Sequence, residues 1–251
     1  MNYFFRGTHL KKIKSLSIVN TLYAFDYDGT LSKISTKIED ANLPNSTYRL
    51  LSILSQQAQV AIVSGRSISD LKKRVRLPNV YLIGNHGLEG VVKGKTNQAS
   101  AKKICVNWLE SLRTQNFDDN IFVEDKKYSI SIHFRESKNR TLSIKKIEAA
   151  IRELSPSPRL IGGKSVYNLI PKDSPNKGTA ILELKKIKRI KNVFYIGDDE
   201  TDEDVFRLPN RSFVTIRVGQ KNTSKAKYYL KGQSEINKLL KFLIVLDGNL
   251  L

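Results

Sequence analysis

Short apolar runs recur along the chain, and each ends in small or polar residues. They cover residues 22–25, 60–63, 80–83 and 193–196, and residues 212–218 continue the pattern. Between the runs, apolar residues recur every three or four positions, which is the spacing of an amphipathic helix. Buried strands that alternate with such helices are typical of a parallel sheet, whose functional site lies at the carboxyl ends of the strands. The pattern therefore predicts an α/β fold.

Residues of about 88–171 follow a different pattern. Apolar residues at helical spacing near 101–112 and 142–154 predict two amphipathic helices. Between these, residues 128–135 alternate strictly between apolar and polar, which predicts a half-buried strand with a polar outer face in an antiparallel sheet. A further strand is predicted at 166–170. We expect this segment to form an inserted α+β domain.

The parallel pattern resumes after the insertion. A helix is predicted after Lys177, and a final helix begins at Ser234. A chain of 251 residues suits one large domain or two modest ones, and 40% hydrophobic residues are enough for an ordinary packed core. We therefore expect residues 1–87 and 172–251 to form one core domain that the insertion interrupts.

The composition argues against several classes of protein. No apolar run approaches the roughly 20 residues that a membrane-spanning helix requires. The N-terminus lacks the continuous apolar segment of a signal peptide, so we expect a cytoplasmic protein. The single cysteine, Cys105, excludes an internal disulfide and a cysteine-built zinc site, and its neighbours predict that it packs in the core on a helix.

The formal net charge of +19 is the most unusual feature of the composition. The densest basic groups, at 185–191 and at Lys102 and Lys103, lie on predicted helices or their ends, with no aromatic residues between them. Single-stranded nucleic acids are usually bound by basic residues combined with aromatic ones. We therefore interpret the charge as a solvated face or as an attraction for anionic small molecules. A nucleic-acid partner is not expected.

Two acidic clusters follow predicted strands. Asp26 and Asp28 come directly after the first strand, with Gly29 permitting the chain to leave the sheet, and a second acidic run begins at Asp198. Carboxylates crowded at one edge of a sheet repel one another, and a hard divalent cation with oxygen ligands relieves the repulsion. We predict that Asp26, Asp28 and Asp198 bind Mg²⁺.

The same edge of the sheet carries groups suited to phosphate. Ser64 offers a hydroxyl, Lys177 offers a cation, and Gly29 frees backbone N–H groups. A carboxylate nucleophile beside a metal would form an aspartyl-phosphate that water then cleaves. A second aspartate would protonate the leaving oxygen and later deprotonate the water. The residues therefore predict a phosphoryl-transfer site.

Four motifs resemble those of the haloacid dehalogenase superfamily of phosphatases. They are Asp26-Tyr-Asp28-Gly-Thr30, Ser64-Gly65-Arg66, Lys177-Gly178 and Gly197-Asp198-Asp199. The resemblance implies a Rossmann-like parallel-sheet core with an inserted cap that covers the active site. It also implies that Asp26 is the nucleophile and that Asp28 is the acid and base, which in addition offers Mg²⁺ its backbone carbonyl.

The remaining motif residues would bind phosphate or metal. The resemblance implies that Ser64 and Lys177 hold the phosphate and that Asp198 completes the metal shell. By the same resemblance, Asp199 and Asp202 orient metal-bound waters.

A closer resemblance, over residues of about 22–243, is to the trehalose-6-phosphate phosphatases. It rests on the extended motifs Ser-Gly-Arg-Ser and Gly-Asp-Asp-Glu-Thr-Asp-Glu-Asp-Val-Phe, on Gly-Asn85-His86-Gly, and on Glu124-Asp-Lys126 followed by Ser131 and His133-Phe-Arg135. This resemblance implies Mg²⁺-dependent hydrolysis of trehalose 6-phosphate to trehalose and phosphate. The positions that would bind the substrate are Arg66, Asn85, His86, Glu124, Lys126, Ser131, His133, Arg135 and Asn168.

Two positions depart from the family pattern: Asn168, where many members have glutamate, and Asn176, where many have aspartate. An uncharged Asn168 leaves the sugar open, and phosphatases for sucrose 6-phosphate or glycosyl-phosphoglycerates are alternatives. A non-catalytic sugar-phosphate or nucleic-acid binding protein is a third, although the intact motifs favour an enzyme. The partner that the resemblance suggests is a trehalose-phosphate synthase.

Overall fold

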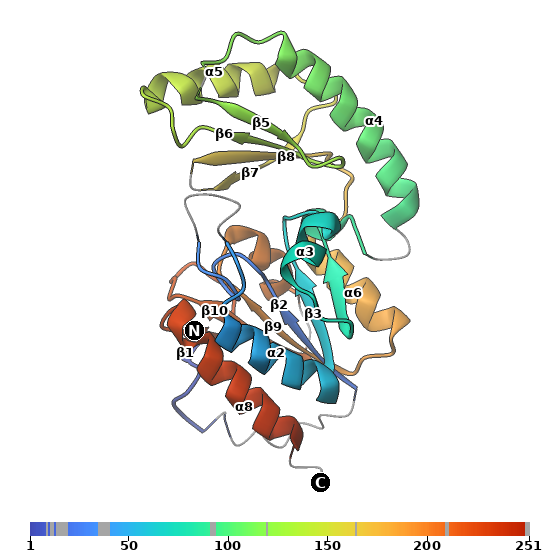
Figure 1. Cartoon of the computed structure of the whole chain (residues 1–251), viewed down its shortest axis with the longest axis vertical. Coiled ribbons are helices and arrows are strands. Elements are labelled where there is room, and N and C mark those ends of the chain that lie inside the picture. The colour runs from blue at the N-terminus through green and yellow to red at the C-terminus, as the bar shows by residue number, and fades with distance from the viewer. Residues whose placement is uncertain are drawn as a thin grey trace. The chain divides into compact units, whose positions relative to one another are not determined.

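The computed structural model describes residues 1–8, 10, 13, 20–34, 41–90, 94–118, 120–163, 165–208 and 211–248. The chain divides into two compact units, shown in Figure 1. The core unit consists of Met1–Val91 and Asn176–Leu251, and the insertion unit consists of Val92–Pro175, four residues later at each end than the expected 88–171. In the described ranges, no helix has the length and apolarity needed to cross a membrane.

A seven-stranded sheet forms the centre of the core unit. In spatial order its strands are β1 (Asn2–Tyr3), β11 (Tyr228–Leu230), β10 (Phe213–Val218), β9 (Asn192–Gly197), β2 (Thr21–Phe25), β3 (Gln59–Val63) and β4 (Val80–Ile83). Every neighbouring pair is parallel, which confirms the predicted sheet. The sequence does not predict β1 and β11, because two or three residues are too few to show a pattern.

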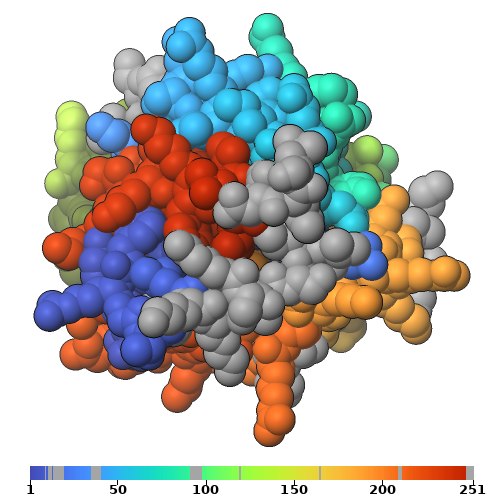
Figure 2. Space-filling view, turned by 90° about the horizontal axis from the view of Figure 1, so that it is seen from below, coloured from blue at the N-terminus to red at the C-terminus, as the bar shows by residue number. Residues whose placement is uncertain are grey.

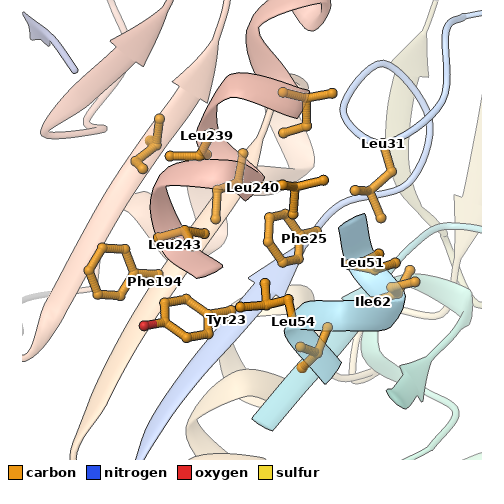
Figure 3. Packing of buried hydrophobic residues seen from close by; sticks show 14 of the residues in the cluster. Tyr23, Phe25, Leu31, Leu51, Leu54, Ile62, Phe194, Leu239, Leu240 and Leu243 are labelled. Atoms are coloured by element: carbon orange, nitrogen blue, oxygen red, sulfur yellow. The ribbon is translucent and has the colours of Figure 1, made fainter. Parts of the chain in front are cut away.

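Helices cover both faces of this sheet. They are α2 (Asn45–Gln57), α3 (Ile68–Arg74), α6 (Lys177–Ile187), α7 (Glu203–Phe206) and α8 (Ile236–Gly248). On β2, Tyr23 and Phe25 pack with α2, α3 and α8 (Figure 3), whereas Leu22 and Ala24 pack with α6 and α7. Alternate side chains of a strand point to opposite faces, so a sheet covered on both faces buries every residue of such a strand. The apolar runs in the sequence are continuous because both faces of these strands are buried.

Aromatic residues cover the edge of the sheet beside β11. The Phe4 ring packs edge-on against Tyr228 and against Phe242 of α8, with centroids 5.9 and 5.5 Å apart. Figure 2 shows this N-terminal segment in blue beside the red C-terminal helix. Because β1 pairs with β11, that strand is not left as an open edge.

The insertion unit is a four-stranded antiparallel sheet packed against two helices. Its strands in spatial order are β5 (Phe122–Asp125), β6 (Ile130–His133), β8 (Val166–Ile170) and β7 (Arg159–Gly163), and its helices are α4 (Gly94–Arg113) and α5 (Arg140–Arg152). Its apolar layer includes Cys105, Trp108, Ile132 and Ile147. Cys105 is a free, buried cysteine on α4, which confirms its predicted place in a core.

The polar face of β6 differs from the prediction. Ser129 and Ser131 are 2% and 0% exposed instead of facing solvent. The strand lies between β5 and β8, and Ser131 donates a hydrogen bond to Asn168 Oδ1 (2.6 Å) in place of one to water. Alternating polarity in the sequence cannot distinguish a face that contacts solvent from a face whose polar groups form hydrogen bonds within the protein. The sequence also does not predict β5 and β7, where charged residues and glycines interrupt the apolar pattern.

Candidate active site

The acidic motifs meet where the order of the parallel strands reverses. β2 pairs with β3 on one side and with β9 on the other, and the backbone N–H of Asp26 donates to the Ile196 carbonyl (2.8 Å). In open α/β sheets, ligands bind at such a switch point, outside the carboxyl ends of the strands. Asp26 follows β2 and Asp198 follows β9, so the first and last acidic motifs share this place, as the sequence predicts.

Three carboxylates form an acidic group at the switch point. Oxygens of Asp26, Asp198 and Asp202 lie within 4.8 Å of one another, and Asp26 is only 4% exposed. Burial raises the pKa of Asp26 well above its ordinary value. Burial, together with the charges of Asp202 and Asp199, raises the pKa of Asp198 to about 7. The crowded oxygens therefore need additional positive charge, and an all-oxygen donor set of this kind fits a hard divalent cation such as Mg²⁺.

The turn after β2 approaches Asp198 closely. Gly29 has a φ of +87°, and a Cβ at this position would lie 2.2 Å from Asp198 Oδ2, so only glycine fits. The neighbouring Thr30 hydroxyl donates to Asp198 Oδ1 (3.2 Å). Thr30 is not among the predicted site residues, because a threonine after a glycine is common in ordinary turns. Its contact helps to orient the Asp198 carboxylate.

Lys177 links two members of the acidic group. Its Nζ donates to Asp26 Oδ1 (2.7 Å) and to Asp202 Oδ1 (2.8 Å), and its side chain is 2% exposed. Burial alone would lower the pKa of Lys177, but the charges of Asp202 and Asp26 raise it above its ordinary value. The amine therefore stays protonated. The sequence predicts a phosphate-binding lysine, and the structure adds its contact with the predicted nucleophile.

Residues around Lys177 fix the start of α6. The Asn176 side chain accepts a hydrogen bond from the Thr179 backbone N–H (2.8 Å), and the Thr179 hydroxyl accepts one from the Asn176 N–H (2.9 Å). Asparagine and aspartate cap helices about equally well. Asn176 therefore caps the helix that presents Lys177, although many family members have aspartate there.

Asp202 shapes the loop after β9. It is 0% exposed, and its Oδ2 accepts hydrogen bonds from the backbone N–H groups of Asp198 and Asp199, both at 2.9 Å. The Tyr195 hydroxyl donates to Asp202 Oδ1 (2.7 Å), a contact that sequence reasoning missed because Tyr195 lies within an apolar strand. By contrast, Asp199 is exposed and accepts a hydrogen bond from the Glu200 N–H (2.7 Å). Asp202 thus belongs to the acidic group itself.

Asp28 pairs with Arg66 and not with the acidic group. Arg66 Nε and Nη2 donate to the two Asp28 oxygens, each at 2.7 Å. Two parallel hydrogen bonds between a guanidinium and a carboxylate fix the orientation of both groups. Arg66 is predicted to bind substrate, whereas the structure shows its guanidinium on Asp28. Metal binding through the backbone carbonyl of Asp28, which the family resemblance implies, does not require its carboxylate.

Asp70 connects Arg66 to a second arginine. It accepts hydrogen bonds from Arg66 Nη1 (2.7 Å) and Arg74 Nε (3.0 Å), and Arg74 Nη1 donates to the Ala41 carbonyl (3.0 Å). Burial disfavours the charged form of Asp70, but the hydrogen bonds from Arg74 and Arg66 hold its pKa below the ordinary value. Burial also disfavours the Arg66 cation, but Asp28 and Asp70 raise the pKa of Arg66. Sequence reasoning missed Asp70, since an acid near a helix start is common for electrostatic reasons.

The chain segments that follow β3 and β4 are bonded to each other. The Ser64 carbonyl accepts from the His86 N–H (3.0 Å), and the Arg66 carbonyl accepts from the Asn85 N–H (2.8 Å). Asn85 and His86 have φ values of 47° and 56°, a left-handed turn that is unfavourable for residues other than glycine. A Cβ on Gly65 would lie 2.5 Å from the His86 ring. The structure thus brings the predicted residues Ser64, Asn85 and His86 together.

Predicted sugar-binding residues of the insertion unit form a polar cluster on one face of its sheet. The register places Glu124 opposite Ser131, and Ser131 opposite Asn168. Glu124 Oε2 lies 2.9 Å from His133 Nε2 and 3.7 Å from Lys126 Nζ. We call these five residues the polar cluster. One carboxylate at its centre therefore orients two cationic or polar neighbours.

Two further residues flank His133. The Phe122 ring stacks on the His133 ring with centroids 5.9 Å apart and an interplanar angle of 27°, while 61% of Phe122 is exposed. Sequence reasoning missed Phe122, because an isolated aromatic residue usually indicates packing. The predicted Arg135 lies past the end of β6 and is exposed.

The fold is the one that the resemblance to the haloacid dehalogenase superfamily implies. A parallel sheet carries acidic residues and a buried lysine at its switch point, and an α+β unit is inserted into this core. The family model described as trehalose-phosphatase matches residues 24–234. The chain therefore belongs to the trehalose-phosphatase family.

Several known proteins are similar to this chain in sequence or in fold. A trehalose-phosphate phosphatase of Mycobacterium ulcerans is 32% identical over 219 residues, which are 81% of this chain and 55% of the relative. An uncharacterised glycosyl hydrolase of Mycobacterium tuberculosis is 32% identical over 198 residues, 72% of this chain and 15% of the relative. The chain thus spans about half the length of these relatives or less. In fold, it resembles the C-terminal domain of Candida albicans trehalose-6-phosphate phosphatase, with a TM-score of 0.74, 23% identity, and coverage of 94% of this chain and 96% of that one.

Proposed function

We propose that the protein is a Mg²⁺-dependent phosphatase that hydrolyses trehalose 6-phosphate to trehalose and inorganic phosphate. Its membership of the trehalose-phosphatase family supports the substrate class. The observation that carries the proposal is the buried contact of Lys177 with Asp26 and Asp202 at the switch point of the sheet. A carboxylate that a neighbouring cation holds in place is suited to attack phosphorus.

Asp26 is the proposed nucleophile. Lys177 donates to Asp26 Oδ1, which leaves Oδ2 for the attack, and the lysine charge favours the ionised carboxylate. Bound Mg²⁺ would offset the negative charge of the phosphoryl oxygens and of the acidic group. Ser64 and Lys177 would hold the other phosphate oxygens. The phosphorus–oxygen bond to the sugar breaks as the bond to Asp26 forms, which gives an aspartyl-phosphate.

Asp28 is the proposed acid and base. It would protonate the departing sugar oxygen and then take a proton from the water that cleaves the aspartyl-phosphate. Both Asp28 oxygens accept hydrogen bonds from Arg66, and each keeps a second lone pair that can face the departing oxygen. The role proposed for Arg66 is therefore to hold Asp28 between these steps.

We assign recognition of the sugar to the polar cluster of the insertion unit. Carboxylate acceptors and cationic donors make the directional hydrogen bonds that sugar hydroxyls require. Ser131 donates to Asn168 Oδ1, so the Asn168 amide NH₂ is the part of that side chain that would donate to a hydroxyl. The pairing of Glu124 with His133 fixes the carboxylate for the same purpose. Asn85, His86 and Arg135 stay predicted substrate contacts.

The test is phosphate release, with Mg²⁺ and with EDTA, from trehalose 6-phosphate, sucrose 6-phosphate, a glucosyl-phosphoglycerate and an aryl phosphate. The proposal expects Mg²⁺-dependent release with a strong preference for trehalose 6-phosphate. Preference for another glycosyl phosphate would support the phosphatase activity and overturn the assignment of trehalose 6-phosphate as the substrate. Release from the aryl ester alone would overturn the role of the polar cluster. No Mg²⁺-dependent release from any substrate would favour a binding protein.

The source of the substrate and the location of the protein stay predictions from the sequence. A trehalose-phosphate synthase would supply trehalose 6-phosphate, and co-purification of tagged protein with synthase activity is the direct test. Fractionation of cells that express the tagged chain would test the predicted cytoplasmic location.

A further inference from the structure

Arg217 contacts the loop after β9, residues 198–202, which we call the acidic loop. Arg217 itself belongs to a different strand and to none of the predicted motifs. It sits on β10 opposite Gly197, the residue that precedes Asp198. Only 8% of it is exposed. An arginine at this depth requires partners, since a buried cation without hydrogen bonds is costly.

The partners of Arg217 are backbone carbonyls of the acidic loop. Its Nη2 donates to the Asp198 carbonyl, and its Nη1 donates to the Asp199 carbonyl (3.2 Å). The N–H groups of the same two residues donate to Asp202 Oδ2. Two buried side chains, Arg217 and Asp202, thus hold all four backbone hydrogen-bonding groups of Asp198 and Asp199. This loop conformation directs the Asp198 carboxylate into the acidic group.

Glu203 balances the charge of Arg217 and is itself anchored. It is 2% exposed, its Oε1 lies 3.5 Å from Arg217 Nη1, and its Oε2 accepts from the Lys225 N–H (2.9 Å). Buried ion pairs add little net stability, and their best-attested use is to fix one conformation among several. Here the pair joins β10 and α7 to the loop that carries Asp198.

We propose that Arg217, supported by Glu203, is a positioning residue that sets the Mg²⁺ affinity of the acidic group by fixing the Asp198–Asp199 backbone. The inference rests on the metal site of the proposed function. A positioning role for Arg217 differs from a purely electrostatic role in the sign of the expected change in Mg²⁺ affinity. A cation near a metal site repels the metal, so removal of Arg217 would tighten Mg²⁺ binding if charge alone mattered. If Arg217 positions the loop, removal weakens binding.

The experiment is calorimetric titration of the folded, EDTA-treated protein with MgCl₂. We expect Arg217→Met to bind Mg²⁺ about 10- to 100-fold more weakly than the unmodified protein, as is usual when residues behind metal ligands are removed. Arg217→Lys, with a single ammonium in place of the two-pronged guanidinium, should recover part of the affinity. Glu203→Gln should cause a smaller loss than Arg217→Met.

Lys221→Met is the matched control. Lys221 is exposed, and its Nζ donates to the side chain of Glu200 in the same loop at 2.7 Å and not to a backbone carbonyl. The substitution Lys221→Met removes the same charge as Arg217→Met without removing a contact with the backbone. Mg²⁺ affinity should therefore stay unchanged or rise. Circular dichroism and thermal melts in EDTA separate loss of folding from loss of affinity.

Unchanged or tighter Mg²⁺ binding by folded Arg217→Met would overturn the inference. If that variant does not fold, Arg217→Lys decides because it keeps the charge, and wild-type affinity in Arg217→Lys would overturn the inference equally. Failure of the unmodified protein to bind Mg²⁺ would instead overturn the metal site of the proposed function. Equal weakening by Lys221→Met, which removes no contact with a loop carbonyl, would show that loss of the Arg217 contacts is not the cause and would also overturn the positioning role.

Discussion

The two units hold their proposed functional residues in different ways. In the core unit, Asp26, Lys177 and Asp202 are 4%, 2% and 0% exposed, and their partners lie within the protein. In the insertion unit, the side chains of Glu124 and His133 are 28% and 22% exposed. Electrostatic interactions between buried groups are strong and hold those groups in place. Partly exposed groups can instead exchange a water molecule for a sugar hydroxyl. The proposed reaction and the proposed sugar recognition therefore rest on different units, and mutations in the two units should have different signatures.

The largest expected effect is that of Asp26→Asn on turnover. An amide cannot form the phosphoryl intermediate, so release from both trehalose 6-phosphate and an aryl phosphate should fall by about 10⁴-fold or more. The fold should persist, because the amide oxygen can still accept the hydrogen bond from Lys177. Phosphate release and circular dichroism measure the two effects, with the exposed Asp173→Asn as control. Turnover close to the control would break the assignment of the nucleophile.

Lys177→Met should destabilise the protein more than any comparable change in the insertion unit. It leaves buried Asp26 and Asp202 without their cation, and breaking a buried pair in this way costs about 3–5 kcal/mol. Lys146→Met removes an exposed pair with Asp118 and should cost about 0–1 kcal/mol. Urea unfolding of both variants gives the comparison. Similar losses in the two would contradict the picture of a rigid core site and a solvated insertion unit.

Glu124→Ala should affect one substrate and spare another. Loss of a hydrogen bond to a charged group should lower kcat/KM for trehalose 6-phosphate by about 10- to 100-fold. Turnover of an aryl phosphate, which has no sugar, should stay near the unmodified level. Exposed Glu110→Ala on α4 is the matched control. An equal fall for both substrates would place Glu124 in the reaction and not in recognition.

The smallest expected effect is on the pH dependence of stability in EDTA. The pKa of Asp198 is about 7 in the folded protein, above its ordinary value of 3.8, so the folded state binds the proton more tightly than the unfolded state does. The contribution of Asp198 to stability is therefore fully present below about pH 4 and is lost as the pH rises through about 7. Urea unfolding between pH 5 and pH 8 should show a steeper decline for the unmodified protein than for Asp198→Asn. Parallel declines would show that Asp198 does not titrate in this range.

Much of the core unit could be predicted from the sequence. Strands buried on both faces appear as continuous apolar runs, and residues that follow parallel strands must meet at one edge of the sheet. The proximity of Asp26 and Asp198 was predicted correctly on this basis, and the family motifs predicted that Lys177 lies at the same site. The short strands β1 and β11 were missed because they carry too few residues to show a period.

The pairing of side chains could not be predicted in the same way. Arg66 and Asp28 are 38 positions apart, and their contact depends on rotamers at the ends of two strands. The burial of Ser131 depends on its neighbours on β5 and β8, which the polarity of the residue does not report. Patterns therefore predict which residues share an edge or a face, and packing decides which of them touch.

The long separation of Lys177 from Asp26, 151 positions along the chain, has a consequence for synthesis. Asp26 leaves the ribosome before the whole insertion unit and before Lys177, and burial of its carboxylate without that cation would be costly. The insertion unit is one continuous segment, whereas the core unit is split in two and must close a long loop. A nascent chain can therefore complete its proposed reaction centre only after the insertion unit has been made. Completion of the proposed phosphoryl-transfer site is thus tied to the prior synthesis of the unit proposed to choose the substrate.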